Sequence, residues 1–134
     1  MAKISQKRGT GCPVAYGLDS FGDRWSLLII RDLMLHGKKT YSAFLASDEN
    51  IATNILISRL KHLEAEGIVS KTKDPENRRS YTYALTDKGR DLAPVMMEII
   101  RWSGRHDTRP EARKDTSDAV MKNPDRFEEK LRGQ

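Results

Sequence analysis

Residues 24–37, RWSLLIIRDLMLHG, would be apolar on nearly every side if they formed a helix. At helical spacing, the apolar side chains of one face are Trp25, Leu28, Ile29 and Leu33, and those that extend it are Leu27, Ile30, Met34 and Leu35. A helix of this kind belongs in the interior of a protein. Asp23 can cap its start and Gly37 can end it. In a chain of 134 residues, the segment predicts one small domain built around this helix.

Two further helices are expected after it, joined by a short turn. Residues 40–46 indicate a short helix that Thr40 can cap, and the polar turn 47–50, SDEN, leads into a longer helix that Gly67 ends. At about 100° per residue, one stripe of the longer helix carries Ala52, Leu56, Leu60 and Leu63. The short helix, the turn and the longer amphipathic helix are therefore predicted to form a helix-turn-helix, in which this stripe packs on the central helix.

A β-hairpin is predicted next. The runs IVSKTKD (68–74) and SYTYAL (80–85) are rich in β-branched and aromatic residues at alternate positions, and they flank the turn-forming residues PENRR (75–79). A hairpin directly after a helix-turn-helix is a wing. The predicted fold class is therefore mainly α with a small β-hairpin wing (α+β), that is, a winged helix-turn-helix.

The predicted winged domain covers residues 12–107. Its first helix, 13–21, opens with Pro13, which suits the first helical position. Its last helix, 88–106, is expected to follow a cap at Thr86 or Asp87. Pro94 lies early in that helix, so the sequence predicts either a kink or a late start.

Two segments flank this domain. Residues 1–11 are polar and contain glycine, which indicates a flexible N-terminal arm. Residues 108–134 form a charged C-terminal extension. It is predicted to be partly helical, because Asn123-Pro124-Asp125 resembles a helix cap with its first turn.

The face of residues 51–66 opposite the leucine stripe has the chemistry of a DNA-reading surface. The candidates on this helix are Thr53, Asn54, Ile57, Ser58 and Lys61, and those on the wing are Lys71, Lys73, Arg78 and Arg79. Asparagine can pair with adenine through two hydrogen bonds, and basic side chains suit phosphates. The net charge of +5 permits nucleic-acid binding without requiring it. The alternative is that this outer face is only solvated, and that the chain is a winged-helix dimer that binds another protein without specific DNA binding.

Other classes of function have little support. The three histidines show no ligand spacing with one another or with the single cysteine, so no metal or other cofactor is expected. No phosphate-binding glycine loop, GxSxG or HExxH motif is present, so the chain is predicted not to be an enzyme. There is no signal-peptide pattern and no apolar run of membrane-spanning length, which favours a cytoplasmic protein associated with the nucleoid.

The chain resembles the HxlR-type winged-helix transcriptional regulators. The resemblance covers about residues 11–107 and is carried by CPV, GDRWSLLIIRDL, RLKHLEAEGIV and YALTDKG in this order. It implies a sequence-specific DNA-binding regulator that acts as a homodimer on an inverted-repeat operator. The implied interface is formed by the helices at 13–21 and 88–106.

The residues assigned to this interface are Val14, Leu18, Val95, Met96, Ile99, Ile100 and Trp102. The apolar surplus in the later helix agrees independently with such a role. The alternative is that these side chains only cover the core of their own domain.

Cys12 precedes Pro13 in GTGCPVAYGL and is expected at the N-cap of the first helix. Unpaired N–H groups and the positive end of the helix dipole favour a thiolate at such a position. By resemblance, Cys12 is a candidate redox switch for thiol-reactive electrophiles or oxidants. The alternative is a small buried residue that anchors the first helix.

Overall fold

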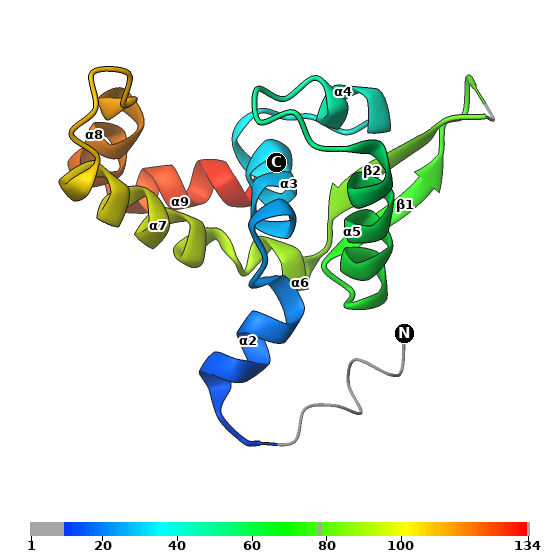
Figure 1. The fold of residues 1–134 in the computed structure, drawn as a ribbon, viewed down its shortest axis with the longest axis horizontal. Helices are drawn as coiled ribbons and strands as arrows, with labels where there is room; N and C mark the ends of the chain where they lie inside the picture. Colours follow the sequence, from blue (N-terminus) through cyan, green and yellow to red (C-terminus); the bar gives the residue numbers. More distant parts are fainter. Residues whose placement is uncertain (1–9, 78, 134) are drawn as a thin grey trace.

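The computed structural model describes residues 10–77 and 79–133. It is mostly helical with one two-stranded antiparallel hairpin, which confirms the predicted winged fold (Figure 1). The elements are α2 (Pro13–Phe21), α3 (Arg24–Leu35), α4 (Tyr41–Leu45), α5 (Thr53–Ala65), β1 (Val69–Lys73), β2 (Tyr81–Leu85), α6 (Asp87–Arg90), α7 (Ala93–His106), α8 (Lys114–Lys122) and α9 (Pro124–Arg132). The predicted arm, residues 1–11, lies almost wholly outside the described residues.

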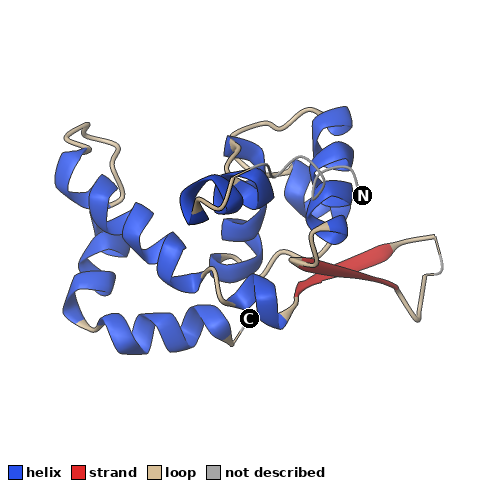
Figure 2. Ribbon diagram, turned by 90° about the horizontal axis from the view of Figure 1, so that it is seen from below, coloured by secondary structure: helices blue, strands red, loops and turns tan. Residues whose placement is uncertain are grey.

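Helix α3 occupies the centre of the molecule, as its sequence predicts. It lies between α5 and the hairpin on one side and α7, α8 and α9 on the other (Figures 1 and 2). Ile30 and Met34 are completely buried, and Phe44 of α4 and Leu56 of α5 join them in the core. Burial of each such side chain favours the folded state by about 1.5–3 kcal/mol.

The helix starts follow the capping chemistry of the sequence. Asp23 accepts a hydrogen bond from the Ser26 N–H, and Thr40 accepts one from the Ala43 N–H. Thr86 and Asn123 cap α6 and α9 in the same way. Each cap satisfies an N–H group that has no partner inside its helix.

The single helix expected at 88–106 is two helices in the structure. Helix α6 ends at Arg90, and α7 begins at Ala93 with Pro94 in its first turn. Proline has no N–H and would clash with a preceding helical turn, so it suits a helix start and interrupts a continuous helix. Of the two predicted outcomes, the structure has the late start.

The C-terminal segment packs on the winged domain through α8 and α9. Val120 of α8 is completely buried and Leu131 of α9 nearly so, and both belong to the main core cluster. A β-carbon on Gly104 of α7 would lie 2.4 Å from the β-carbon of Ser117, so glycine permits the close approach of α7 and α8. Residues 114–132 therefore share one core with the rest of the chain.

The hairpin pairs Val69 with Leu85 and Lys73 with Tyr81 at its two ends. The segment before α4 extends this sheet by one bridge, between Thr40 and Thr82, and the Tyr83 N–H donates to the Lys39 carbonyl at 2.8 Å. Only the base of the hairpin is anchored in the core, and its tip extends beyond the helices (Figure 2).

Candidate nucleic-acid interface

Helix α5 separates its side chains into a buried stripe and an exposed face. Leu56, Leu60 and Leu63 are buried, and α5 packs on α3 and α4. All five candidates from the sequence lie on the opposite, exposed face: Thr53, Asn54, Ile57, Ser58 and Lys61. The predicted stripe differs at Ala52, which is exposed and stands at the N-cap.

The first turn of α5 is open at its N-terminus. Ala52 has no side-chain oxygen, and no side chain caps this helix. The N–H groups of the first turn therefore point outward at the positive end of the helix dipole, which is an arrangement that attracts anions such as phosphate. The turn before it contains Asn50 at φ +58°, a left-handed conformation that asparagine tolerates better than most residues.

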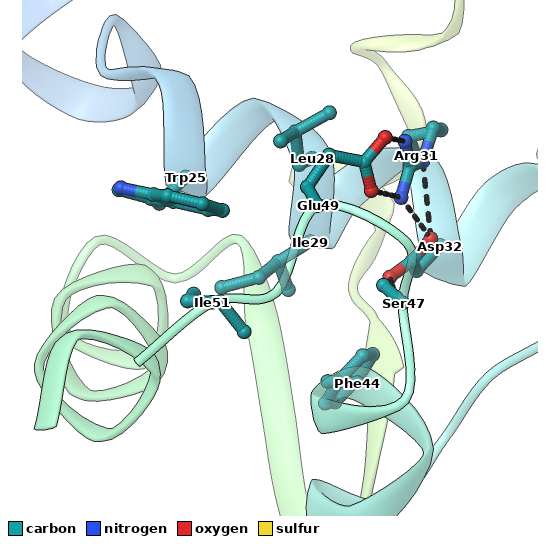
Figure 3. Close-up of a pocket in the computed structure, with 9 residues that line it drawn as sticks. All are labelled: Trp25, Leu28, Ile29, Arg31, Asp32, Phe44, Ser47, Glu49 and Ile51. Carbon is teal, nitrogen blue, oxygen red and sulfur yellow. Dashed lines mark hydrogen bonds and ion pairs between the residues drawn. The ribbon is translucent and has the colours of Figure 1, made fainter. Parts of the chain in front are cut away.

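A polar network fixes this turn to α3 (Figure 3). The buried carboxylate of Asp32 accepts a hydrogen bond from the Ser47 hydroxyl at 2.6 Å, and the same hydroxyl accepts one from Lys38 at 2.8 Å. Arg31 donates to Asp32 at 2.7 Å and to both oxygens of Glu49, at 2.8 and 2.9 Å. The hydrogen bond from Arg31 is the largest cause that holds the pKa of Glu49 at about 2.

Contacts on the other side of α5 tie it to the corner between α2 and α3. His62 Nε2 lies 2.9 Å from the Ser20 carbonyl oxygen. Arg59 donates to Asp23 at 3.3 Å and to the Ser58 hydroxyl at 3.2 Å. The sequence reasoning missed Arg59, because its partner Asp23 is distant in the sequence. Together with the Arg31 network, these contacts fix the position of α5 relative to α2 and α3.

The wing presents basic side chains near its tip. Lys71, Lys73 and Arg79 are exposed, and Lys71 Nζ lies 4.2 Å from the centre of the Tyr81 ring. Asp74 and Glu76 lie on the same loop and reduce its positive charge. Arg78, the remaining predicted wing contact, lies outside the described residues.

Large apolar side chains are exposed on α2 and α7. Val14 and Leu18 are 67% and 58% exposed, and Ile99 and Trp102 are 41% and 62% exposed. Val95 and Ile100 are half-buried. The assignment of Met96 to an interface is wrong for this structure, because its side chain is 5% exposed and belongs to the core of its own chain.

Cys12 stands at the N-cap of α2 and is exposed. The structure therefore excludes the alternative of a cysteine buried in its own chain. Helix α2 extends from the start of α3, away from the other helices (Figure 1). The described residues include no group of histidine, cysteine, aspartate and glutamate side chains that could hold a metal ion. Within the same residues, no helix is long and apolar enough to span a bilayer.

Comparison with known proteins places this arrangement in a family. A family model described as HxlR-like helix-turn-helix matches residues 20–111. YvaP of Bacillus subtilis strain 168, an uncharacterised HTH-type transcriptional regulator, is 40% identical over 86 residues, which are 64% of this chain and 79% of YvaP.

Two solved structures have the same fold. The redox regulator HypR in its oxidised form is 30% identical with a TM-score of 0.63, over 71% of this chain and 97% of HypR. The diamide-treated YodB from B. subtilis is 32% identical with a TM-score of 0.57, over 71% of this chain and 94% of YodB. The chain belongs to the HxlR-like helix-turn-helix family of DNA-binding transcriptional regulators.

Proposed function

We propose that this regulator reads a specific inverted-repeat operator as a homodimer, with one α5 in the major groove of each half-site. The observation that carries this proposal is the exposed polar face of α5, which lies opposite three buried leucines and begins in an open first turn. A major groove about 12 Å wide admits one helix, and the N-terminal residues of such a helix meet the base edges. Thr53 and Asn54 occupy that position.

The wing supplies the contacts that do not depend on sequence. Lys71, Lys73 and Arg79 are exposed cations on or beside β1 and β2, and each suits a phosphate. Binding of each phosphate releases condensed counterions, so the affinity should fall steeply as salt rises.

The homodimer is proposed to form through α2 and α7. Val14, Leu18, Ile99 and Trp102 place large apolar surfaces on these two helices, and exposed apolar groups of this size favour association. A two-fold axis between two copies would place the two α5 helices about 34 Å apart, which is one turn of DNA.

Cys12 is proposed to make DNA binding responsive to oxidants or electrophiles. Its thiol is exposed on α2, one of the two proposed interface helices, and it lies outside the residues that match the family model. HypR was solved in oxidised and reduced forms, and YodB after treatment with diamide. Diamide would oxidise the Cys12 thiols of two copies to a disulfide and would itself be reduced to the hydrazine.

A mobility-shift series tests the function. The wild-type protein is titrated onto DNA from upstream of its own gene and onto a shuffled sequence, at several salt concentrations. We expect a shift that is selective for the upstream DNA and weakens with salt. Absence of a selective shift would leave the protein-interaction alternative.

The same assay with and without diamide, on wild type and Cys12→Ser, tests the thiol. We expect diamide to change the shift of the wild type only. An equal response of the two proteins would remove Cys12 from the mechanism. As a regulator on DNA, the protein would act in the cytoplasm at the nucleoid.

A further inference from the structure

A groove of about 560 Å³ lies between α3, α7 and the segment 107–117 that leads into α8. Four half-buried apolar side chains line it: Leu27, Leu28, Leu35 and Ile100. Volumes of about 300–1,000 Å³ are typical of sites for small organic ligands. Because these side chains are only half-buried, they can still contact an added apolar group.

Two cations, Lys38 and Arg113, lie at one end of the groove beside the carboxylate of Asp48. Lys38 donates to the Ser47 hydroxyl at 2.8 Å, and Arg113 reaches the neighbouring residue Asp48 at 3.4 Å, so both cations stand at the same end. The Arg113–Asp48 pair is long and highly exposed, and pairs of this kind contribute little to stability. Arg113 is therefore free to exchange its partner at small cost.

His36 lines the same end of the groove, close to these cations. Burial lowers the pKa of His36 most, and the charges of Arg31, Lys38 and Arg113 lower it further, with Asp32 acting in the opposite direction. Positive charge thus dominates around this imidazole. The lining as a whole contains five lysine and arginine residues against four aspartate and glutamate residues. At this end Arg31, Lys38 and Arg113 face the carboxylates of Asp48 and Glu49, which leaves an excess of one positive charge among the lining residues.

The same end of the groove borders the turn that leads into α5. Residues 47–49 line it, together with Arg31, which holds Glu49 through two hydrogen bonds. A ligand at this end would therefore contact the network that orients α5. This is a direct physical connection between the groove and the DNA-reading helix.

We propose that this groove binds a small amphipathic carboxylate, with its apolar body on the leucines of α3 and its carboxylate between Lys38 and Arg113, and that binding changes the affinity for DNA. The second part of the proposal rests on the proposed DNA-binding function, whereas the first part stands without it. The site joins the C-terminal segment, through Arg113, to the helix-turn-helix, through residues 47–49.

Isothermal titration calorimetry with two matched probes tests the site on the full chain without DNA. 1-Naphthoate and the 1-naphthylmethylammonium cation share a ring system and differ in charge. We expect naphthoate to bind at least tenfold more tightly than the cation. Ser103→Phe, which would fill the groove from α7, should abolish naphthoate binding. Arg113→Ala should weaken binding about tenfold through loss of a charge-assisted contact, whereas Arg126→Ala on α9 should leave it unchanged.

Each result decides the proposal. No heat of naphthoate binding at 1 mM to the wild type, or equal binding to wild type and folded Ser103→Phe, would overturn the site. If Ser103→Phe does not fold, equal binding to wild type and Arg113→Ala would overturn it instead, because Arg113 is exposed and its replacement leaves the core intact. Fluorescence anisotropy with upstream DNA then measures the connection to α5. If naphthoate binds in the groove but the affinity for DNA does not change, the proposed connection to α5 is overturned. If the chain binds no DNA at all, only the proposed DNA-binding function fails, and the proposed ligand site still stands.

Discussion

Two surfaces of this protein face solvent with opposite chemistry. The exposed face of α5 carries Thr53, Asn54, Ser58 and Lys61, whereas α2 and α7 expose Val14, Leu18, Ile99 and Trp102. The α5 face is costly to dehydrate unless a partner supplies hydrogen bonds, as base edges and phosphates do. The apolar face gains free energy simply by leaving water. The contrast supports the proposal that DNA binds the first surface and a second copy of the chain binds the second.

The largest expected effect comes from a charge on the apolar surface. Trp102→Glu should convert the proposed dimer to a monomer, because a carboxylate buried in the interface without a partner is strongly disfavoured. A monomer engages one half-site at a time, so affinity for the operator should fall on the order of 100-fold or more. Light scattering coupled to size-exclusion chromatography measures the first change and fluorescence anisotropy the second.

Met121→Glu is the matched control for this variant. Met121 is 59% exposed, close to the 62% of Trp102, but lies on α8, outside the proposed interface. It should change neither mass nor DNA affinity. A Trp102→Glu protein that remains dimeric would contradict the proposal that the apolar surface of α2 and α7 forms the dimer interface.

A smaller effect is expected on the polar surface. Asn54→Ala should weaken operator binding about tenfold, since a two-hydrogen-bond contact to a base contributes about 1–3 kcal/mol of discrimination. Stability to urea should stay within about 0.5 kcal/mol, because the side chain is exposed. Affinity for shuffled DNA provides the internal control. Equal losses on operator and shuffled DNA would show that Asn54 contributes no base specificity.

The network that orients α5 should depend on pH. In the folded chain the pKa of Glu49 is about 2, below its ordinary 4.5, so its ionised form stabilises the fold above pH 4.5 and this contribution is lost as pH falls towards 2. Glu49→Gln should lower the free energy of unfolding by about 1 kcal/mol at pH 7. In urea titrations, the two proteins should converge as the pH approaches 2. A difference that is independent of pH would mean that the charge of Glu49 does not stabilise the turn.

The smallest effect is expected on the wing. Lys73→Ala should weaken binding to operator and shuffled DNA alike, by about threefold at low salt, and should reduce the salt slope by about 1. Arg126→Ala is the control, because it removes the same charge from α9, which is distant from α5 and the hairpin in Figure 1. An identical salt slope for Lys73→Ala and wild type would remove this lysine from the phosphate contacts.

Local chemistry made much of the fold predictable. Asp23, Thr40, Thr86 and Asn123 cap helices where the sequence placed them, since a capping side chain bonds to N–H groups two or three residues away. Helix α8 was not recognised from the sequence. Its sequence KDTSDAVMK has few apolar residues and no side-chain cap, and its burial depends on the distant Gly104.

The same distinction between local and distant partners applies to the candidate site. The exposed face of α5 follows from helical periodicity, so its five candidates were predictable. The partners of Arg31 were not. Arg31 pairs with Asp32 and Glu49, and Asp23 pairs with Arg59 in addition to capping α3. Met96 was misassigned because a helix that packs on two neighbours, α8 and α9, buries more than one stripe.

The alanine at the N-cap of α5 suggests that bound DNA would also affect the stability of this helix. In the free protein the first turn of this helix lacks a side-chain acceptor at Ala52. A phosphate oxygen at the same place would complete the turn, so the nucleic acid would act as the missing cap. Any anion that binds the folded turn more tightly than the unfolded chain raises the stability of the fold by mass action. Recognition and the folding of the reading helix are then one coupled equilibrium, and DNA would stabilise the helix that reads it.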